Sequence, residues 1–313
     1  MIPPLIVLAL GALLFEICAP SYLSKVMVSL QSLIGETQNL TIHLTEIRAR
    51  YIWLSTVCFN LVVPIYAISV CTFIIVQVPV RRQLITLLII GALLIIFGSF
   101  ILAFEIKSEG AVYRLIYGFA YFSLKNSGQF DVDFINQVRL VISSLNILSF
   151  IAPVFVLVAG ASILASPGDK NQSNAALIAT QMRQIKNIIN VGSALLVSGI
   201  IHTNAWLQWP LSLVAEPQTH KAFSEAAMVI VLFWGTTFTL MLFMFAAPSI
   251  AYLNNQAHVL SQLELQAGRI ADPQKWLKDQ GLSHTSGEQF SQVIAILGPL
   301  LAGPVGAAIA STL

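Results

Sequence analysis

The feature that most constrains this chain is a series of long segments without formal charge, each long enough to cross a bilayer as a helix. About 20 apolar helical residues span roughly 30 Å of hydrocarbon. Six segments meet this requirement, and only the first contains an acidic or basic residue, Glu16. They cover residues 3–19, 52–79, 84–104, 140–165, 187–209 and 226–253. We therefore predict an all-α polytopic membrane helix bundle with six or seven transmembrane helices.

Composition agrees with this prediction. Of the 313 residues, 57% are hydrophobic and 10% are charged, whereas about a quarter of the residues in a soluble domain are charged. One soluble core could not cover so much apolar surface, so most of the chain is expected in contact with the lipid bilayer. The formal net charge of +2 leaves no basic surface suited to nucleic acid, and we expect no nucleic-acid partner.

The doubtful seventh span is the small-residue-rich C-terminal helix, residues 291–313, which contains two prolines. Ala302, Gly303 and Gly306 stand at spacings that allow two helices to approach closely, which makes them candidate oligomerisation residues. One interpretation inserts this helix into the membrane as a pore-lining or oligomerising element. The other packs it under the bundle, where it covers an apolar face without entering the membrane.

The pattern divides the chain into successive segments rather than soluble domains, because no connection is long enough to fold alone. Residues 1–20 are a first, uncleaved transmembrane helix, 51–104 a transmembrane hairpin, and 140–253 three further transmembrane helices. The segments between and after them are an amphipathic heptad-like helix at 21–50, an aromatic interfacial or re-entrant segment at 105–139, and a polar helical connection at 254–290.

Apolar side chains in residues 21–50 recur every three and four positions, and this stripe includes Leu30, Leu33 and Leu44. These three residues are therefore candidates for contact with another helix or another copy. Because no helix stop precedes Tyr51, one helix is predicted from about residue 21 to 78. The alternative places residues 21–50 on the membrane surface as an amphipathic helix.

Two shorter helices are predicted in the other connections. The aromatic residues between the third and fourth spans favour an interfacial helix over 110–124. In the polar connection, Asp272 precedes Pro273, and Gly281 follows a short run of helix-forming residues. This pattern predicts a helix that Asp272 caps and Gly281 ends.

Orientation is weakly specified, because the 16 Lys and Arg residues divide equally between the two predicted sides. The short loop containing Arg81 and Arg82 favours a cytoplasmic N-terminus, as does the scarcity of cations in the 210–225 connection. We expect an integral protein of a bacterial inner membrane or a plasma membrane.

The spans contain almost no ionisable residues, which argues against buried acid–base chemistry. No hydrolase, nucleotide-binding or metalloprotease motif is present, and the three cysteines lack the spacing of a metal site. The sequence therefore favours a protein that is not an enzyme and predicts no cofactor and no metal site.

Four polar residues within the spans are candidate lining of a cavity: His202, Asn204, Asn60 and Asn146. The spans that contain Asn60 and Asn146 each carry a proline as well, which is typical of a bent helix beside a wet cavity. Two other interpretations stay open. His202 and Asn204 fit the headgroup boundary, and the two other amides fit hydrogen bonds between helices.

These observations predict a non-enzymatic integral membrane protein that assembles with itself or joins a membrane complex, as a channel, a pore or an anchor. One alternative is a small-molecule transporter or membrane enzyme with its site around His202. A second is a membrane sensor that passes a signal through the helix at 23–50 into the next span.

Overall fold

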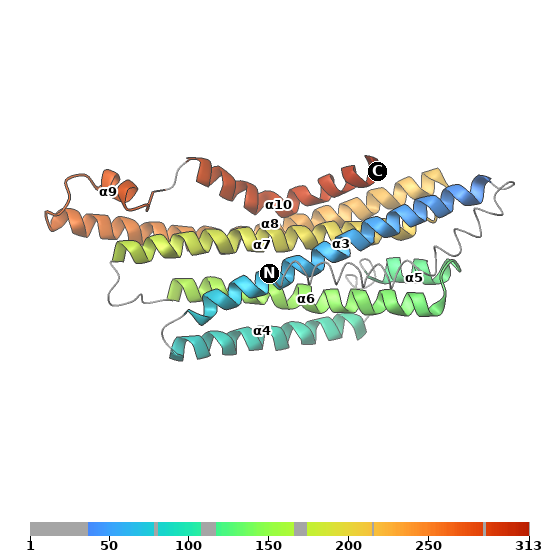
Figure 1. Ribbon diagram of the computed structural model, residues 1–313, viewed down its shortest axis with the longest axis horizontal. Coiled ribbons are helices and arrows are strands. Elements are labelled where there is room, and N and C mark those ends of the chain that lie inside the picture. Colours follow the sequence, from blue (N-terminus) through green and yellow to red (C-terminus); the bar gives the residue numbers. More distant parts are fainter. Residues whose placement is uncertain are drawn as a thin grey trace, which may run out of the picture.

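The computed structural model describes residues 37–77, 81–107, 117–165, 174–214, 216–283 and 286–312. All regular structure in these ranges is helical, and the long helices run side by side along one axis (Figure 1). The predicted span at 3–19, together with Leu30 and Leu33, lies outside the described residues.

The long helices are α3 (Thr37–Val76), α4 (Arg81–Lys107), α6 (Val132–Ala165), α7 (Asn174–Leu211), α8 (Pro217–Gln266) and α10 (Ser286–Thr312). Two short helices, α5 (Phe119–Asn126) and α9 (Pro273–Asp279), lie at opposite ends of the molecule (Figure 1). Helix α7 is central and contacts α3, α6, α8 and α10. Helix α6 also contacts α3 and α4, and α10 also contacts α8.

Four of these helices are long and apolar enough to cross a membrane: His43–Val76, Val132–Leu164, Asn174–Leu211 and His220–Gln266. Two shorter apolar stretches, Leu88–Phe100 and Gln289–Val305, correspond to the predicted third and seventh spans. The all-helical membrane fold is therefore confirmed with four candidate spans, and the larger number of six or seven stays a prediction.

Helix α3 is continuous from Thr37 through residue 51 to Val76, so the predicted amphipathic segment and the following span share one helix over the described part. Helix α5 covers Phe119–Asn126, within and just beyond the predicted helix at 110–124, of which residues 110–116 lie outside the described residues. Helix α9 matches its prediction: Asp272 Oδ1 accepts hydrogen bonds from the backbone N–H of Gln274 at 2.9 Å and of Lys275 at 3.2 Å. Gly281 follows with a φ of +66°, which a side chain would disfavour.

Small residues let α10 lie close to its two neighbours. A Cβ at Gly235 of α8 would stand 2.7 Å from the Pro299 carbonyl oxygen, and one at Gly298 would stand 2.8 Å from Ser193 Oγ of α7. Gly303 lies against Val231 of α8, where a Cβ would come within 3.1 Å of the valine side chain. The backbone of α10 therefore approaches α8 more closely than any residue with a side chain at position 235 allows.

Pro299 breaks the hydrogen bonding of α10, and neighbouring helices repair the break. Proline has no N–H, so the carbonyl four residues earlier, that of Ala295, loses its helical donor. Ser193 Oγ of α7 donates to this carbonyl. The Leu300 N–H donates to Thr239 Oγ1 of α8 at 3.1 Å. These two side chains fix the proline bend at one position along α7 and α8.

Substitution of Gly235 by alanine is expected to push α10 away from α8, because the added methyl meets backbone atoms that cannot rotate aside. Overpacking of this kind costs about 1–3 kcal/mol, so the thermal unfolding midpoint in detergent should fall. Gly199→Ala is the matched control on a neighbouring helix, since nothing lies within 4 Å of its Cβ position. An unchanged midpoint for Gly235→Ala would contradict the close contact.

Candidate functional site

Two polar contacts join the facing sides of α3 and α7 inside the spans. Thr56 Oγ1 lies 3.3 Å from His202 Nδ1, and Ser198 Oγ lies 3.0 Å from Asn60 Oδ1 and 2.8 Å from the Leu195 carbonyl oxygen. All four side chains are buried. Because residues four apart lie one above the other on a helix, the two contacts are successive levels of one interface. The structure thus places His202 and Asn60 in the same region of the bundle.

The Thr56 hydroxyl has two polar neighbours. It donates to the Trp53 carbonyl at 2.7 Å, and its oxygen lies 3.3 Å from His202 Nδ1, where the donor and acceptor roles depend on the histidine tautomer. Thr56 therefore connects the backbone of α3 to a side chain of α7.

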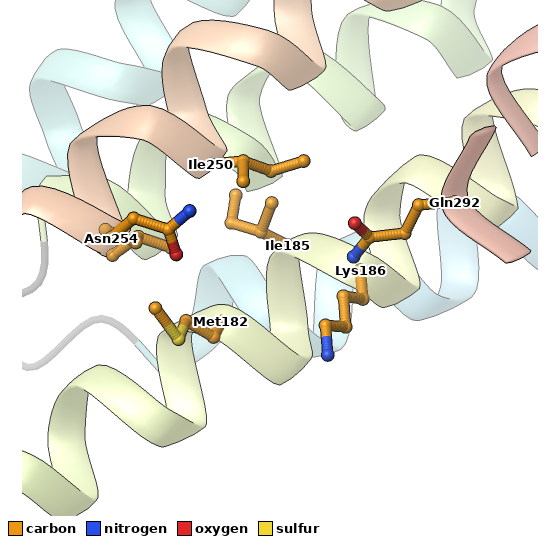
Figure 2. A pocket seen from close by; sticks show the side chains of 7 residues that line it. Met182, Ile185, Lys186, Ile250, Asn254 and Gln292 are labelled. Carbon is orange, nitrogen blue, oxygen red and sulfur yellow. The ribbon is translucent and has the colours of Figure 1, made fainter. Parts of the chain in front are cut away.

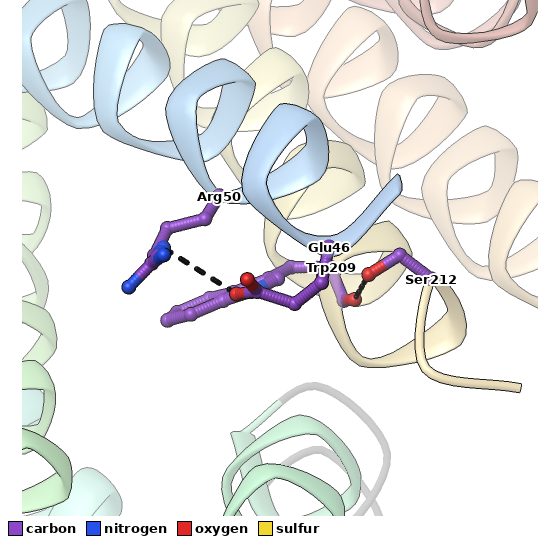
Figure 3. Close-up of polar contacts among 4 residues, drawn as sticks. All are labelled: Glu46, Arg50, Trp209 and Ser212. Carbon is purple, nitrogen blue, oxygen red and sulfur yellow. Dashed lines mark hydrogen bonds and ion pairs between the residues drawn. The ribbon is translucent and has the colours of Figure 1, made fainter. Parts of the chain in front are cut away.

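A buried ion pair lies beyond these contacts, nearer to the start of α3 (Figure 3). Glu46 is fully buried and Arg50 is 2% exposed, and Glu46 Oε1 lies 3.4 Å from Arg50 Nε. Trp209 of α7 donates its indole N–H to the same carboxylate oxygen at 2.8 Å. The Arg50 guanidinium also stands 5.6 Å from the centre of the Phe134 ring of α6. One carboxylate therefore links α3 to α7, and its arginine contacts α6.

Sequence analysis did not single out Glu46 and Arg50. The pair stands at the i, i+4 spacing of a helical ion pair, and the uncharged run begins directly after Arg50. This spacing was a usable signal. It could not show burial, because burial depends on Trp209, which is more than 150 residues away in the chain.

Stacked tryptophans connect the ion pair to the His202 level. Trp53 stacks on Trp209 with ring centres 4.6 Å apart, and it also contacts Trp206 at 5.7 Å and His202 at 6.5 Å. Trp53 is fully buried, and within the described part of the chain its indole N–H has no hydrogen-bond partner. We define the buried polar column as the ion pair, the four rings and the polar contacts between α3 and α7. Its members are Glu46, Arg50, Trp53, Thr56, Asn60, Ser198, His202, Trp206 and Trp209.

The two other candidate amides lie elsewhere. Asn204 is two residues from His202, which places it about 200° around α7 and away from α3. It is 3% exposed, and its Oδ1 finds no hydrogen-bond partner among the residues that the structure describes. Asn146 is exposed on the outer surface of α6. The structure therefore brings together two of the four predicted cavity residues, His202 and Asn60.

Asn146 belongs to a polar stripe on α6. The members of this stripe share one helix face at spacings of three and four, are all exposed, and make no side-chain hydrogen bond or ion pair within the described ranges. We define the α6 polar stripe as Asn136, Arg139, Ser143 and Asn146. Asn146 lies within the candidate span Val132–Leu164, six residues after the start of the uncharged run at 140–165. The polar face thus extends about 9 Å into the uncharged part of α6.

Several other exposed hydroxyls in the spans differ from Ser143 because they are already bonded. Ser144 donates to the Leu140 carbonyl at 3.0 Å, and Thr236 donates to the Leu232 carbonyl at 2.9 Å. A hydroxyl that bonds to its own helix can face lipid at low cost. Ser143 makes no such bond in the described part of the chain, and the Asn146 amide has more donors and acceptors than one such bond would satisfy.

Helix α4 covers the continuation of this face. A Cβ at Gly98 would overlap the Phe150 ring, and one at Gly91 would stand 3.1 Å from the Val158 side chain. Phe150 and Val158 follow the stripe toward the C-terminal end of α6. The apolar half of the face is therefore packed within the chain, whereas the polar half is exposed.

Two hollows lie away from both sites. The smaller, about 10 Å³, is between α7, α8 and α10, and Lys186, Asn254 and Gln292 contribute its polar lining (Figure 2). The larger is an open groove of about 360 Å³ between α6, α7 and α8. Neither contains a residue of the buried polar column or of the α6 polar stripe. Among the described residues, no group of three or more His, Cys, Asp or Glu side chains could hold a metal ion.

The candidate oligomerisation residues that the structure describes lie in different surroundings. Leu44 is 53% exposed on α3 and is available to another chain. Ala302 is buried, and Gly303 lies against Val231 of the same chain. Gly306 falls within α10. The small residues of α10 are thus used in packing within the chain, and contact between chains stays a prediction.

Replacing Glu46 by alanine is expected to destabilise the protein strongly, because Arg50 keeps its buried charge and loses this carboxylate. Breaking a buried pair typically costs about 3–5 kcal/mol. Glu225→Ala is the matched control, because Lys221 and Glu225 form an i, i+4 pair whose side chains are 79% and 68% exposed. Thermal unfolding in detergent should show a large loss for Glu46→Ala only. Equal effects of the two variants would contradict a structural role for the column.

Comparisons with protein-family models, with curated proteins and with solved structures find no match for this chain. What the protein does has to be inferred from its own residues.

Proposed function

We propose that the protein is a non-enzymatic integral membrane protein that assembles with copies of itself into a channel, with the α6 polar stripe facing the lumen. One observation carries this proposal: Ser143 and Asn146 are exposed inside the candidate span Val132–Leu164 and have no hydrogen-bond partner in the described part of the chain. Polar groups at that depth need either water or protein beside them.

Contact of the α6 polar stripe with lipid would carry a large cost in free energy. Moving an amide into hydrocarbon without a hydrogen bond costs roughly 4–8 kcal/mol. An arginine at the centre of a spanning helix costs about 2.5–3.5 kcal/mol on insertion scales, and less near the boundary. A stripe facing lipid would therefore cost several kcal/mol per chain. A water-filled lumen removes this cost, because water hydrogen-bonds to each member.

The rest of the outer surface is suited to lipid. Helix α8 exposes large apolar side chains, among them Val229 at 66%, Phe233 at 63% and Met244 at 71%. The buried polar column is closed by packed tryptophans, and we identify no described hollow that reaches it. A lumen is therefore expected between chains rather than within one. A closed ring of copies, each presenting α6 to the axis, provides it.

The direct test combines oligomeric state with ion flux. The protein purified in mild detergent should form a discrete oligomer, and proteoliposomes containing it should release entrapped ions. A strictly monomeric protein in ion-tight vesicles would contradict the proposal. An oligomer in ion-tight vesicles would contradict the channel and would favour an anchor within a complex.

Cysteine accessibility tests which helix faces water. In a background in which Cys18, Cys58 and Cys71 are replaced by alanine, Asn146→Cys should react with a membrane-impermeant, charged thiol reagent. Thr237→Cys is the control, because Thr237 is also exposed in a candidate span and its hydroxyl already bonds to the Phe233 carbonyl. We expect labelling at position 146 only. Equal protection of both positions would place α6 against lipid or protein.

A further inference from the structure

We infer that the lumen selects small anions, because Arg139 lies at its mouth. This inference rests on the proposed function and adds the class of ion that passes. Arg139 is exposed on the α6 polar stripe and has no carboxylate partner within the described ranges. It stands seven residues before Asn146, which is about 10 Å along the helix.

Arg139 is the last charged residue before the uncharged part of α6. From Phe134 to Ala165 this helix contains no Asp or Glu, so no carboxylate of α6 lies deeper than the arginine. Asp131 and Asp133 lie further out, where Asp131 Oδ1 accepts a hydrogen bond from the Phe134 N–H at 2.7 Å. An ion that follows the stripe inward passes these acids first and then meets the arginine.

The remaining groups of the stripe also suit an anion. Beyond Arg139, Ser143 offers a hydroxyl and Asn146 an amide N–H₂, and both can donate hydrogen bonds to a partly dehydrated anion. In a ring of copies, the guanidinium groups repeat around the axis at a level inside that of Asp131 and Asp133, so an ion that has passed these acids meets a ring of positive charge. A small monovalent anion such as chloride fits this sequence of one cation and two neutral donors.

The experiment measures reversal potential in planar bilayers that contain the full chain, with a tenfold potassium chloride gradient. We expect the wild-type potential to lie toward the chloride equilibrium potential. Arg139→Lys should keep this sign, Arg139→Gln should move the potential toward zero, and Arg139→Glu should reverse it. Lys221→Gln is the control, because Lys221 is an exposed cation of α8 that pairs with Glu225, away from α6. It should leave the potential unchanged.

The possible outcomes distinguish a failure of anion selection from a failure of the channel proposal. Conductance that prefers cations, or a preference that no Arg139 variant alters, overturns anion selection and leaves the channel intact. A protein that assembles or stays monomeric but never conducts overturns the channel itself. If Arg139→Glu fails to assemble, the comparison of Arg139→Gln with Arg139→Lys still separates an effect of charge from one of structure.

Discussion

Hydrocarbon offers no hydrogen-bond partner, and this constraint explains most of what the described residues do. It requires helices throughout the membrane and compels repair wherever a helix is interrupted. At Pro299, Ser193 of α7 donates to the Ala295 carbonyl, which the proline leaves without its helical donor, and Thr239 of α8 accepts from the Leu300 N–H. Close approach of the backbones makes this repair possible, so the glycine at position 235 and the hydroxyls form one arrangement.

The same constraint separates two kinds of polar group within the membrane. In the buried polar column, Glu46, Thr56 and Asn60 find partners on α7, and the result is a tight connection between helices distant in the chain. On α6, Ser143 and Asn146 find none in the described ranges. Polar groups of the first kind stabilise the bundle, whereas those of the second kind indicate where it meets water or another chain.

The sequence predicted the helices well, because bilayer thickness fixes the length of an uncharged run and because Asp272, Pro273 and Gly281 mark the ends of α9 locally. It did not predict which way polar residues point. His202 and Asn204 are two positions apart and lie on different sides of α7, while Asn60 is inside and Asn146 is outside. Helix packing determines which side of a helix faces inward, and the partners of Thr56 and Asn60 on α7 are more than 100 residues away in the chain.

Helix α8 has 50 residues and is about 75 Å long, more than twice the hydrocarbon thickness. A helix of this length carries displacement along its axis, since no loop interrupts it. Its softest point is Pro248, where one backbone hydrogen bond is missing. The part beyond Pro248 stays packed on α7, because Leu253 and Ala257 are buried in the same core as Ile185. One continuous helix therefore joins the contact with α10 to the polar connection that contains α9.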